Sequence, residues 1–528
     1  MATDPLIEGK LERLRNNSAN ADKKLAAKAG ALGKAHIGTS YTSAERIKAL
    51  RLVEKNREEA NWPGARTHYE IDRDQVLFHD SFVRLARKTQ VFTGPHSAAY
   101  RNRLMHTLEV VQLTRSVAES NYLNVDLAEA IAYGHDIGHT PFGHAGEDAL
   151  DLCLCEYFIR LCLSDFFKSQ GFGDHLRPHA AGLTPIGNAD ARHLDNAIWL
   201  LVQKLAHCDP GGPAGLSATA ISCLAHEGLH QELLRKKILT ASGILYRLGA
   251  PLTWERSTAF DHVRTLTHEF WLQPDSTRFF SHNVHSLRVL LCNPMKDYAD
   301  LTKQCAYGIL AHPHRGKYPH PFVIQLPTGE VTLSHDKCQT PEAFAVGCAD
   351  DICFVSSDIT DAGHAGLMIW GELQPNEEVV FRELGGIQSR CADFPPPSQR
   401  IQHCEENFDF GANPPTHKLS RQLDEAKQII KRLVHSKLLA RQDSARRVIR
   451  DLFWFFCVPP REHDRRPVEA AAYHQFAQAP FWTGSPERQA TDYVASLTDD
   501  EAVEIHTALF SPENADWERH FAPVKQNT

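Results

Sequence analysis

Apolar residues recur at helical spacing through much of this chain. Between residues 69 and 151, Leu104, Leu108 and Val111 lie on one face of a helical pattern, with Arg103, Glu109 and Arg115 on the other face. This three-to-four-residue period is typical of amphipathic helices. A second pattern runs through residues 123–133 and leads into the densest histidine cluster of the chain. The sequence therefore predicts helices that flank that cluster.

Helical patterns also run through residues 218–248, 258–272, 282–292, 298–311 and 341–358, and an amphipathic tail starts at Leu419. The segment 313–336 is rich in proline and predicts irregular structure with a short β-hairpin around Val331. We find no internal repeat and no regular alternation of strands and helices. The predicted fold class is mainly α, a helical bundle with a loop-rich insertion and extra C-terminal helices.

Changes in composition divide the chain into four parts. Residues 1–60 have few large apolar side chains and predict an exposed helical or flexible arm. Residues 61–391 form the predicted core, and glycines and prolines mark an insertion around 153–240 with a short helix at 197–206. Prolines 395–397, 414 and 415 mark a linker over 392–417, and residues 418–528 form a helical C-terminal region.

Composition and charge exclude several classes of protein. Of the 528 residues, 42% are hydrophobic and 23% charged, which is ordinary for a globular protein. No apolar run approaches the roughly 20 residues of a membrane span, and the polar, acid-containing residues 1–24 do not resemble a secretory signal. The 13 cysteines include no Cys-x-x-Cys pair, so we expect reduced thiols in a cytoplasmic protein.

The net charge of −8 argues against the whole protein binding DNA as a polycation, although a local basic patch can hold a phosphate. One such patch is the basic helix Lys418–Arg450. Weak nucleic-acid binding through this helix stays open, but a solvated helix face is the commoner origin of such a run.

Candidate chemistry centres on the segment 132–147, which holds His135, Asp136, His139, His144 and Glu147 among glycines. Adjacent imidazole and carboxylate groups at a helix end suit Mn, Fe, Co, Ni or Mg rather than a thiolate zinc site. Gly138 and Pro141 break the helix, so the later histidines should project from a tight turn.

Further metal ligands are available on both sides of this segment. His106 lies on the predicted helix around Leu104, and Asp350 and Asp351 are adjacent within an otherwise apolar helix. Burying acids is costly unless they are paired or bound to metal. Taken alone, His106 is more often a core histidine, and the apolar flanks weaken the alternative that the two aspartates are an exposed acid pair without excluding it.

The order His106, His135–Asp136 and Asp350 resembles the signature of the HD superfamily. The amino-acid sequence of the surrounding blocks resembles that of one family within this superfamily, the deoxynucleoside triphosphate triphosphohydrolases (dGTPases). These blocks are 80–92, 100–110, 138–147, 280–290 and 349–352, and they span residues of about 70–360 in order. The C-terminal third offers no motif.

The resemblance implies an all-helical HD fold that hydrolyses a deoxynucleoside triphosphate to deoxynucleoside and tripolyphosphate. It assigns a divalent ion (Mn²⁺, Mg²⁺, Co²⁺ or Ni²⁺) to His106, His135, Asp136 and Asp350. Asp350 is chosen over Asp351 because the family's later acid falls eight positions on, at Asp358.

The remaining roles follow from the same resemblance: proton transfer by His144 and Glu147, phosphate lining by His139 and His282, a triphosphate grip by Arg103, and substrate contacts from Asn283 and Asp358. We also expect a nucleotide as the bound partner and a homo-oligomeric assembly.

Three departures from the family pattern leave the substrate open. Ala86 stands where the family has Gln, Phe354 where it has Tyr, and Ala311 where it has a phosphate-binding Lys. An alternative is therefore an HD phosphohydrolase acting on a nucleoside monophosphate, a ribonucleotide or a signalling nucleotide. A nucleotide-sensing scaffold without activity would predict the loss of a metal ligand or of His144, and neither is lost.

Overall fold

The computed structural model describes residues 67–91, 100–121, 123–162, 270–271, 278–292, 299–314, 318, 321–326, 329–334, 338–365, 373–385, 402, 417–459, 462–478 and 484–511. The predicted arm at 1–60 lies outside the described residues, as does the linker except for residues 402 and 417. The predicted insertion around 153–240 is described only to Cys162, where it continues a helix.

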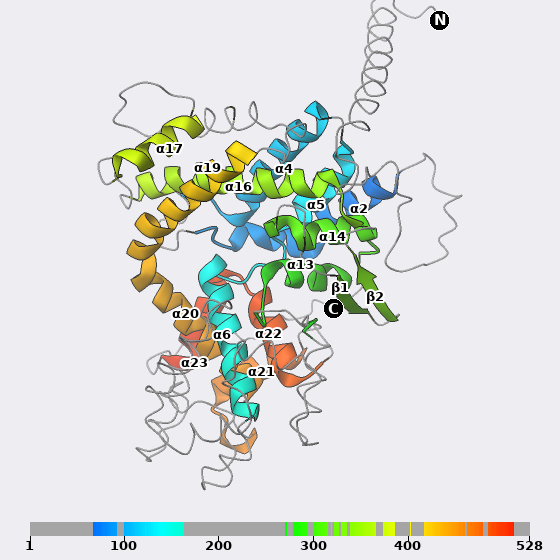
Figure 1. Cartoon of the computed structure of the whole chain (residues 1–528). Coiled ribbons are helices and arrows are strands. Elements are labelled where there is room, and N and C mark those ends of the chain that lie inside the picture. The colour runs from blue at the N-terminus through cyan, green and yellow to red at the C-terminus, as the bar shows by residue number, and fades with distance from the viewer. Residues whose placement is uncertain are drawn as a thin grey trace, which may run out of the picture.

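The first half of the core consists of α2 (His68–Leu77), α3 (Asp80–Arg84), the 3-10 turn η3 (Leu85–Arg87), α4 (Arg103–Ser120), α5 (Val125–Gly134) and α6 (Gly143–Cys162). Asn102 and Asn124 begin α4 and α5, because each side chain accepts a hydrogen bond from a backbone amide of the first turn. Helix α5 packs between α2 and α4 (Figure 1).

The prediction that Arg103 lies on the polar face of α4 is wrong. Its guanidinium is fully buried and contacts Asp136, whose carboxylate balances the charge. Leu108, expected on the apolar face, is 41% exposed. Hydrophobic periodicity alone does not reveal that a buried acid will draw an arginine inward.

The second half of the core consists of α13 (His282–Leu291), α14 (Lys303–Ala311), the 3-10 turn η5 (His312–His314), strands β1 (Phe322–Leu326) and β2 (Gly329–Leu333), α16 (Pro341–His364) and α17 (Pro375–Gly385). The predicted hairpin is confirmed: β1 and β2 pair antiparallel, with Phe322 opposite Leu333. Helix α16 crosses α4 and α5 and also contacts α14 (Figure 1).

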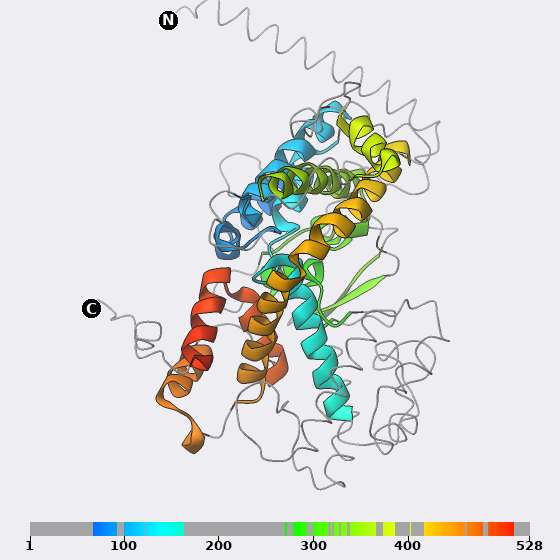
Figure 2. The same cartoon turned by 90° about the vertical axis from the view of Figure 1, so that its left-hand side faces the viewer.

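The C-terminal region consists of α19 (His417–Ile430), a π-helical turn η7 (Lys431–His435), α20 (Ser436–Cys457), the 3-10 turn η8 (Glu462–Asp464), α21 (Pro467–Gln478), α22 (Pro486–Ser496) and α23 (Asp499–Phe510). Helix α20 lies along α6 and packs on α22 and α23 (Figure 2). Buried rings of Trp454, Phe456 and Tyr493 fill this part of the core.

The prediction of a mainly α fold is confirmed, since the hairpin is the only sheet among the described residues. Within those residues no helix is long and apolar enough to cross a membrane.

Several basic residues of 418–450 form ion pairs with acids of other helices: Lys427 with Asp351, Arg432 with Glu377, and Arg450 with Glu156. Because some of these basic side chains are already paired with acids of the fold, nucleic-acid binding by residues 418–450 stays a prediction.

Candidate active site

The HD turn, residues 135–142, connects α5 to α6. Phe142 and Gly143 both have positive φ angles, 62° and 57°, a conformation that a non-glycine residue adopts at a cost of about 1–2 kcal/mol. The turn is held from outside, because the Phe142 amide donates to Asp499 Oδ1 at 2.9 Å. The chain reversal brings His144 and Glu147, at the start of α6, close to the end of α5.

Gly138 fixes how closely this turn approaches α13. A Cβ at this position would lie 2.1 Å from the Ser286 amide nitrogen and 2.5 Å from the His282 carbonyl oxygen. The Gly138 amide instead donates to Ser286 Oγ at 2.9 Å, and that hydroxyl donates to the His135 carbonyl at 3.0 Å. The first turn of α13, which carries His282, is thereby fastened to the HD turn.

The four predicted metal ligands come together, with His106, His135 and Asp136 buried and the Asp350 side chain 25% exposed. His106 Nε2 lies 3.0 Å from Asp350 Oδ1 and 4.0 Å from Asp136 Oδ2. His135 Nε2 lies 3.5 Å from Asp136 Oδ2 and 3.8 Å from Asp350 Oδ1. The neighbouring Asp351 pairs with Lys427 instead. The structure therefore brings Asp350, the residue chosen from the sequence, to the histidines.

The donor set fits a divalent cation. His135 Nδ1 donates to the Ala132 carbonyl at 2.7 Å, so its Nε2 carries the lone pair. That Nε2 atom is buried and has no hydrogen-bond partner among the described residues. A ring N–H bound to a backbone carbonyl, with the other nitrogen free, is the usual arrangement of a metal-ligating histidine.

Charge supports the same interpretation. Burial alone would raise the pKa of Asp136, but His135 and Arg103 outweigh burial and hold that pKa well below its usual range. Arg103 Nη1 donates to Asp136 Oδ2 at 2.6 Å. For Asp350, burial again opposes ionisation, while the hydrogen bond with His106 and the charges nearby lower its pKa. Both carboxylates are thus ionised and ready for a cation.

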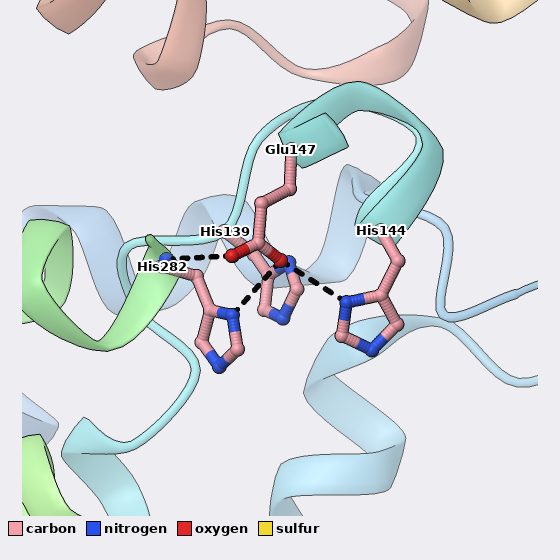
Figure 3. A group of neighbouring side chains, drawn as sticks. All are labelled: His139, His144, Glu147 and His282. Atoms are coloured by element: carbon pink, nitrogen blue, oxygen red, sulfur yellow. Dashed lines mark hydrogen bonds and ion pairs between the residues drawn. The ribbon is translucent and has the colours of Figure 1, made fainter. Parts of the chain in front are cut away.

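A second group, next to the first, is centred on Glu147 (Figure 3). Its Oε2 atom lies 3.1 Å from His144 Nδ1 and 3.0 Å from His282 Nδ1, and its Oε1 accepts from the His282 amide at 3.0 Å. The ring of His139 stacks on that of His282, with centroids 3.9 Å apart. His139 Nε2 is 3.4 Å from Asp136 Oδ1, which joins the two groups.

Glu147 is an ionised carboxylate in a buried place. Burial would raise its pKa, but the charge of His282 and the hydrogen bonds from His144 and His282 hold the pKa well below the usual value. Burial would lower the pKa of His282, and the Glu147 charge raises it instead. His144 differs from the others because its side chain is 51% exposed. Of the described histidines around Glu147, His144 is therefore the most accessible to a substrate.

The three predicted substrate-binding residues are all buried. Arg103 contacts Asp136 and the Gln90 carbonyl. The Asn283 amide donates to the Leu310 carbonyl at 2.7 Å and so ties α13 to α14. Burial raises the pKa of Asp358 to about 8, which leaves this residue largely protonated at neutral pH. Their roles toward a substrate stay predictions.

One residue of the site was not predicted from the sequence. His312, directly after α14, lies with its ring centroid 5.1 Å from that of His135 and 5.6 Å from that of His282. Burial lowers its pKa to about 3, so it is a neutral imidazole. In the sequence, His312 resembles His135 only because each follows a predicted helix. No regular spacing connects these two histidines.

Comparison with known proteins agrees with this geometry. A family model described as the HD domain matches residues 103–182, and one described as a phosphohydrolase-associated domain matches residues 416–508. The second match lies in the C-terminal region, where the sequence offered no motif.

Curated relatives match around the HD motif. A deoxyguanosinetriphosphate triphosphohydrolase-like protein of Azoarcus sp. is 54% identical over 95 residues, which are 18% of this chain and 25% of the relative. A protein of the same name from Desulfatibacillum aliphaticivorans is 51% identical over 164 residues, 29% of this chain and 46% of the relative. The chain thus spans between a quarter and about half the length of these relatives.

The two family models match in order along the chain, and His106, His135 and Asp136 of the HD motif form one buried cluster. The chain therefore carries an HD domain followed by a phosphohydrolase-associated domain, and it resembles deoxyguanosinetriphosphate triphosphohydrolase-like proteins around the HD motif.

Proposed function

We propose that this protein is a metal-dependent triphosphohydrolase that converts a deoxynucleoside triphosphate to deoxynucleoside and tripolyphosphate. The observation that carries the proposal is the position of the Glu147-bound His144 beside the HD metal ligands, joined to them through His139 and Asp136. The names of the similar proteins support the same substrate class.

His106, His135, Asp136 and Asp350 would hold the divalent ion. When bound, such an ion polarises a phosphoryl oxygen and lowers the pKa of bound water toward neutrality. Arg103 serves this site through Asp136, since its guanidinium keeps that carboxylate ionised and in place.

The proton-handling step belongs to His144. Hydrolysis adds hydroxide from water to the α-phosphorus, breaks the bond from phosphorus to the sugar 5′-oxygen, and leaves a proton on that oxygen. His144 Nδ1 donates to the ionised Glu147, which orients the ring, and its Nε2 is the atom that gives or takes the proton. His139 and His282 line the phosphate side of the same group.

A second candidate substrate is another nucleotide, and the observation behind it is the apolar character of Ala86 and Phe354. Neither side chain can form the hydrogen bond that Gln or Tyr would offer to a sugar. A site without such partners discriminates hydroxyl variants weakly. We therefore expect looser discrimination among sugars or bases than the family norm.

One screen tests both candidates. Each deoxy- and ribonucleoside triphosphate is incubated with Mg²⁺, Mn²⁺, Co²⁺ or Ni²⁺, and the products are separated by anion-exchange chromatography. Tripolyphosphate supports the first candidate, whereas orthophosphate or pyrophosphate supports the second. Turnover of a single nucleotide, with all others inert, would contradict the expected loose discrimination.

A further inference from the structure

Three acids of α6 face the residues that lead into α13. Glu147 and Asp151 are four positions apart in this helix, so they lie on one face, one turn from each other. Asp148 lies next to Glu147, and all three acids are within ion-pair distance of the Arg278 guanidinium. Two of them, Glu147 and Asp151, also accept hydrogen bonds from backbone amides of the facing segment.

Asp151 holds the residues that directly precede α13. Its Oδ1 atom accepts from the Phe279 amide at 2.7 Å and from the Phe280 amide at 3.0 Å. One turn earlier in α6, Glu147 Oε1 accepts from the His282 amide at 3.0 Å. The two carboxylates thus bind three of the four amides of residues 279–282, and they fix this segment against α6.

The charge of Asp151 suits this task. Arg278 Nε lies 3.5 Å from Asp151 Oδ2, which leaves Oδ1 to the two amides. Burial raises the pKa of Asp151 to about 6, although Arg278 and the two amides oppose that rise. The carboxyl is therefore mostly ionised at neutral pH, and hydrogen bonds from amides to an ionised carboxylate are about twice as strong as those between neutral groups.

His282 stands where the held segment ends. Its ring Nδ1 lies 3.0 Å from Glu147 Oε2, and its ring stacks on that of His139 with centroids 3.9 Å apart (Figure 3). Ser281, which begins α13, has an extended backbone, and its side chain forms no capping hydrogen bond. The position of the first residue of α13 therefore depends on the acceptors of α6.

We propose that Asp151 is a positioning residue, which sets the place of His282 by holding the two amides just before α13. It acts through the backbone of residues 279–280 on the ring that lines the phosphate side of the site. The effect on turnover rests on the proposed function, whereas the effect on the segment 279–282 does not.

Hydrogen exchange tests the positioning without any turnover. Amide exchange of the full chain is followed by mass spectrometry on peptides that cover residues 279–282. We expect exchange there to be at least about tenfold faster in Asp151→Ala than in the wild type, because two buried amides lose their acceptor. Asp151→Asn keeps an oxygen that accepts from both amides, so this variant should exchange like the wild type.

Asp148→Ala is the matched control for this experiment. The Asp148 side chain is 46% exposed and pairs with Arg278, while the amides of 279, 280 and 282 donate to the other two acids. Its removal takes a negative charge from the same turn of α6 and leaves the acceptors in place. Exchange at 279–282 should therefore equal that of the wild type.

Steady-state kinetics with deoxynucleoside triphosphates show whether the effect passes through His282. We expect Asp151→Ala to lower kcat by about tenfold or more, since small displacements of catalytic groups are costly, and Asp151→Asn to restore most of the loss. Added to His282→Ala, Asp151→Ala should cause no further loss, because residues that act as a unit are not additive.

Three results would overturn the proposal: unchanged exchange in Asp151→Ala, equally faster exchange in Asp148→Ala, or a further drop in kcat when Asp151→Ala is added to His282→Ala. If the wild type hydrolyses no nucleotide, the proposed function fails, and the exchange experiment still decides whether Asp151 holds the segment. If thermal melting shows that Asp151→Ala does not fold, Asp151→Ser, with a side chain one bond shorter than that of Asp, replaces it with the same expected results.

Discussion

At the scale of single residues, Glu147 serves a different helix from the one that carries it. A carboxylate near the start of α6 could be a cap of its own helix. Instead, its Oε1 accepts from the His282 amide in α13, and its Oε2 accepts from the rings of His144 and His282. Glu147 thus orients two imidazoles at once.

This arrangement predicts a strong effect of removing His144. We expect His144→Ala to lower kcat by about 10²–10⁴, the usual contribution of a general acid or base, while bound metal is unchanged. The double variant with Glu147→Ala should be no slower than Glu147→Ala alone, because the two act as a unit. Steady-state kinetics decide, and multiplicative losses would show that the residues work independently.

A second residue-scale prediction concerns Asp358, whose pKa burial raises to about 8. The folded state keeps the proton across a range in which the unfolded chain has lost it. The stability from this group is therefore complete below about pH 4 and is lost as pH rises to about 8. Asp358→Asn stays neutral throughout.

We expect Asp358→Asn to match the wild type near pH 4 and to exceed it at pH 9 by on the order of a few kcal/mol. Urea unfolding at the two pH values measures the difference. An equal difference between variant and wild type at both pH values would show that Asp358 does not titrate in this way.

The sequence was sufficient for some residues of the site and not for others. His135 and Asp136 are adjacent, and Asp350 follows from motif order, so these could be predicted. His312 could not, because its role depends on α14 ending beside α5. Arg103 was assigned to the substrate, since nothing local in the sequence indicates its contact with Asp136.

At the scale of elements, the close approach of the HD turn to α13 depends on Gly138. Gly138→Ala would place a Cβ against backbone atoms of Ser286 and His282, which cannot rotate away. We expect a loss of stability of about 1–3 kcal/mol, together with a lower kcat, because His282 moves with α13.

Gly363→Ala is the matched control for this prediction. Gly363 lies in α16, and a Cβ added there would meet nothing within 4 Å, so alanine should be neutral or stabilising by up to about 1 kcal/mol. Thermal melts of both variants test the contrast. If the two behave alike, the tight contact at Gly138 does not matter.

Helices α5, α13 and α14 were predictable from the sequence, although nearly all of their residues are buried and not one face alone. Helix ends were less so: α16 continues to His364, beyond the expected end at residue 358, because buried Ile359 and Ala362 extend its packed face. The 3-10 turn that places His312 is too short to produce a period.

At the scale of the whole molecule, the C-terminal helices hold the HD turn. Asp499, at the start of α23, accepts from the amides of Phe142 and Thr89 at 2.9 and 3.0 Å. Lys88 donates to the carbonyls of His139 and Ala495, and burial lowers its pKa to about 7. The contacts of Thr89 with Asp499 and of Lys88 with Ala495 connect residues about 400 positions apart, so no local pattern in the sequence predicts them.

We therefore expect Asp499→Ala to reduce kcat by roughly tenfold or more, since a small displacement of catalytic groups is costly, and to lower the melting temperature. Asp500→Ala, which removes an exposed acid from the same first turn, should do neither. Measuring kcat and the melting temperature of both variants separates the loss of the hydrogen bonds to Asp499 from the loss of a charge at the helix terminus. A normal kcat in Asp499→Ala would show that these hydrogen bonds do not position the catalytic groups.

The contacts of Lys88 and Asp499 also bear on how this protein could be divided into fragments. The stretch that matches the HD domain, residues 103–182, contains neither of these residues nor Asp350. A fragment cut to that stretch would keep the recognisable motif but lack one predicted metal ligand and the residues that hold its strained turn. The segment that a sequence comparison recognises is thus shorter than the segment that must be expressed or grafted to keep the geometry of the site.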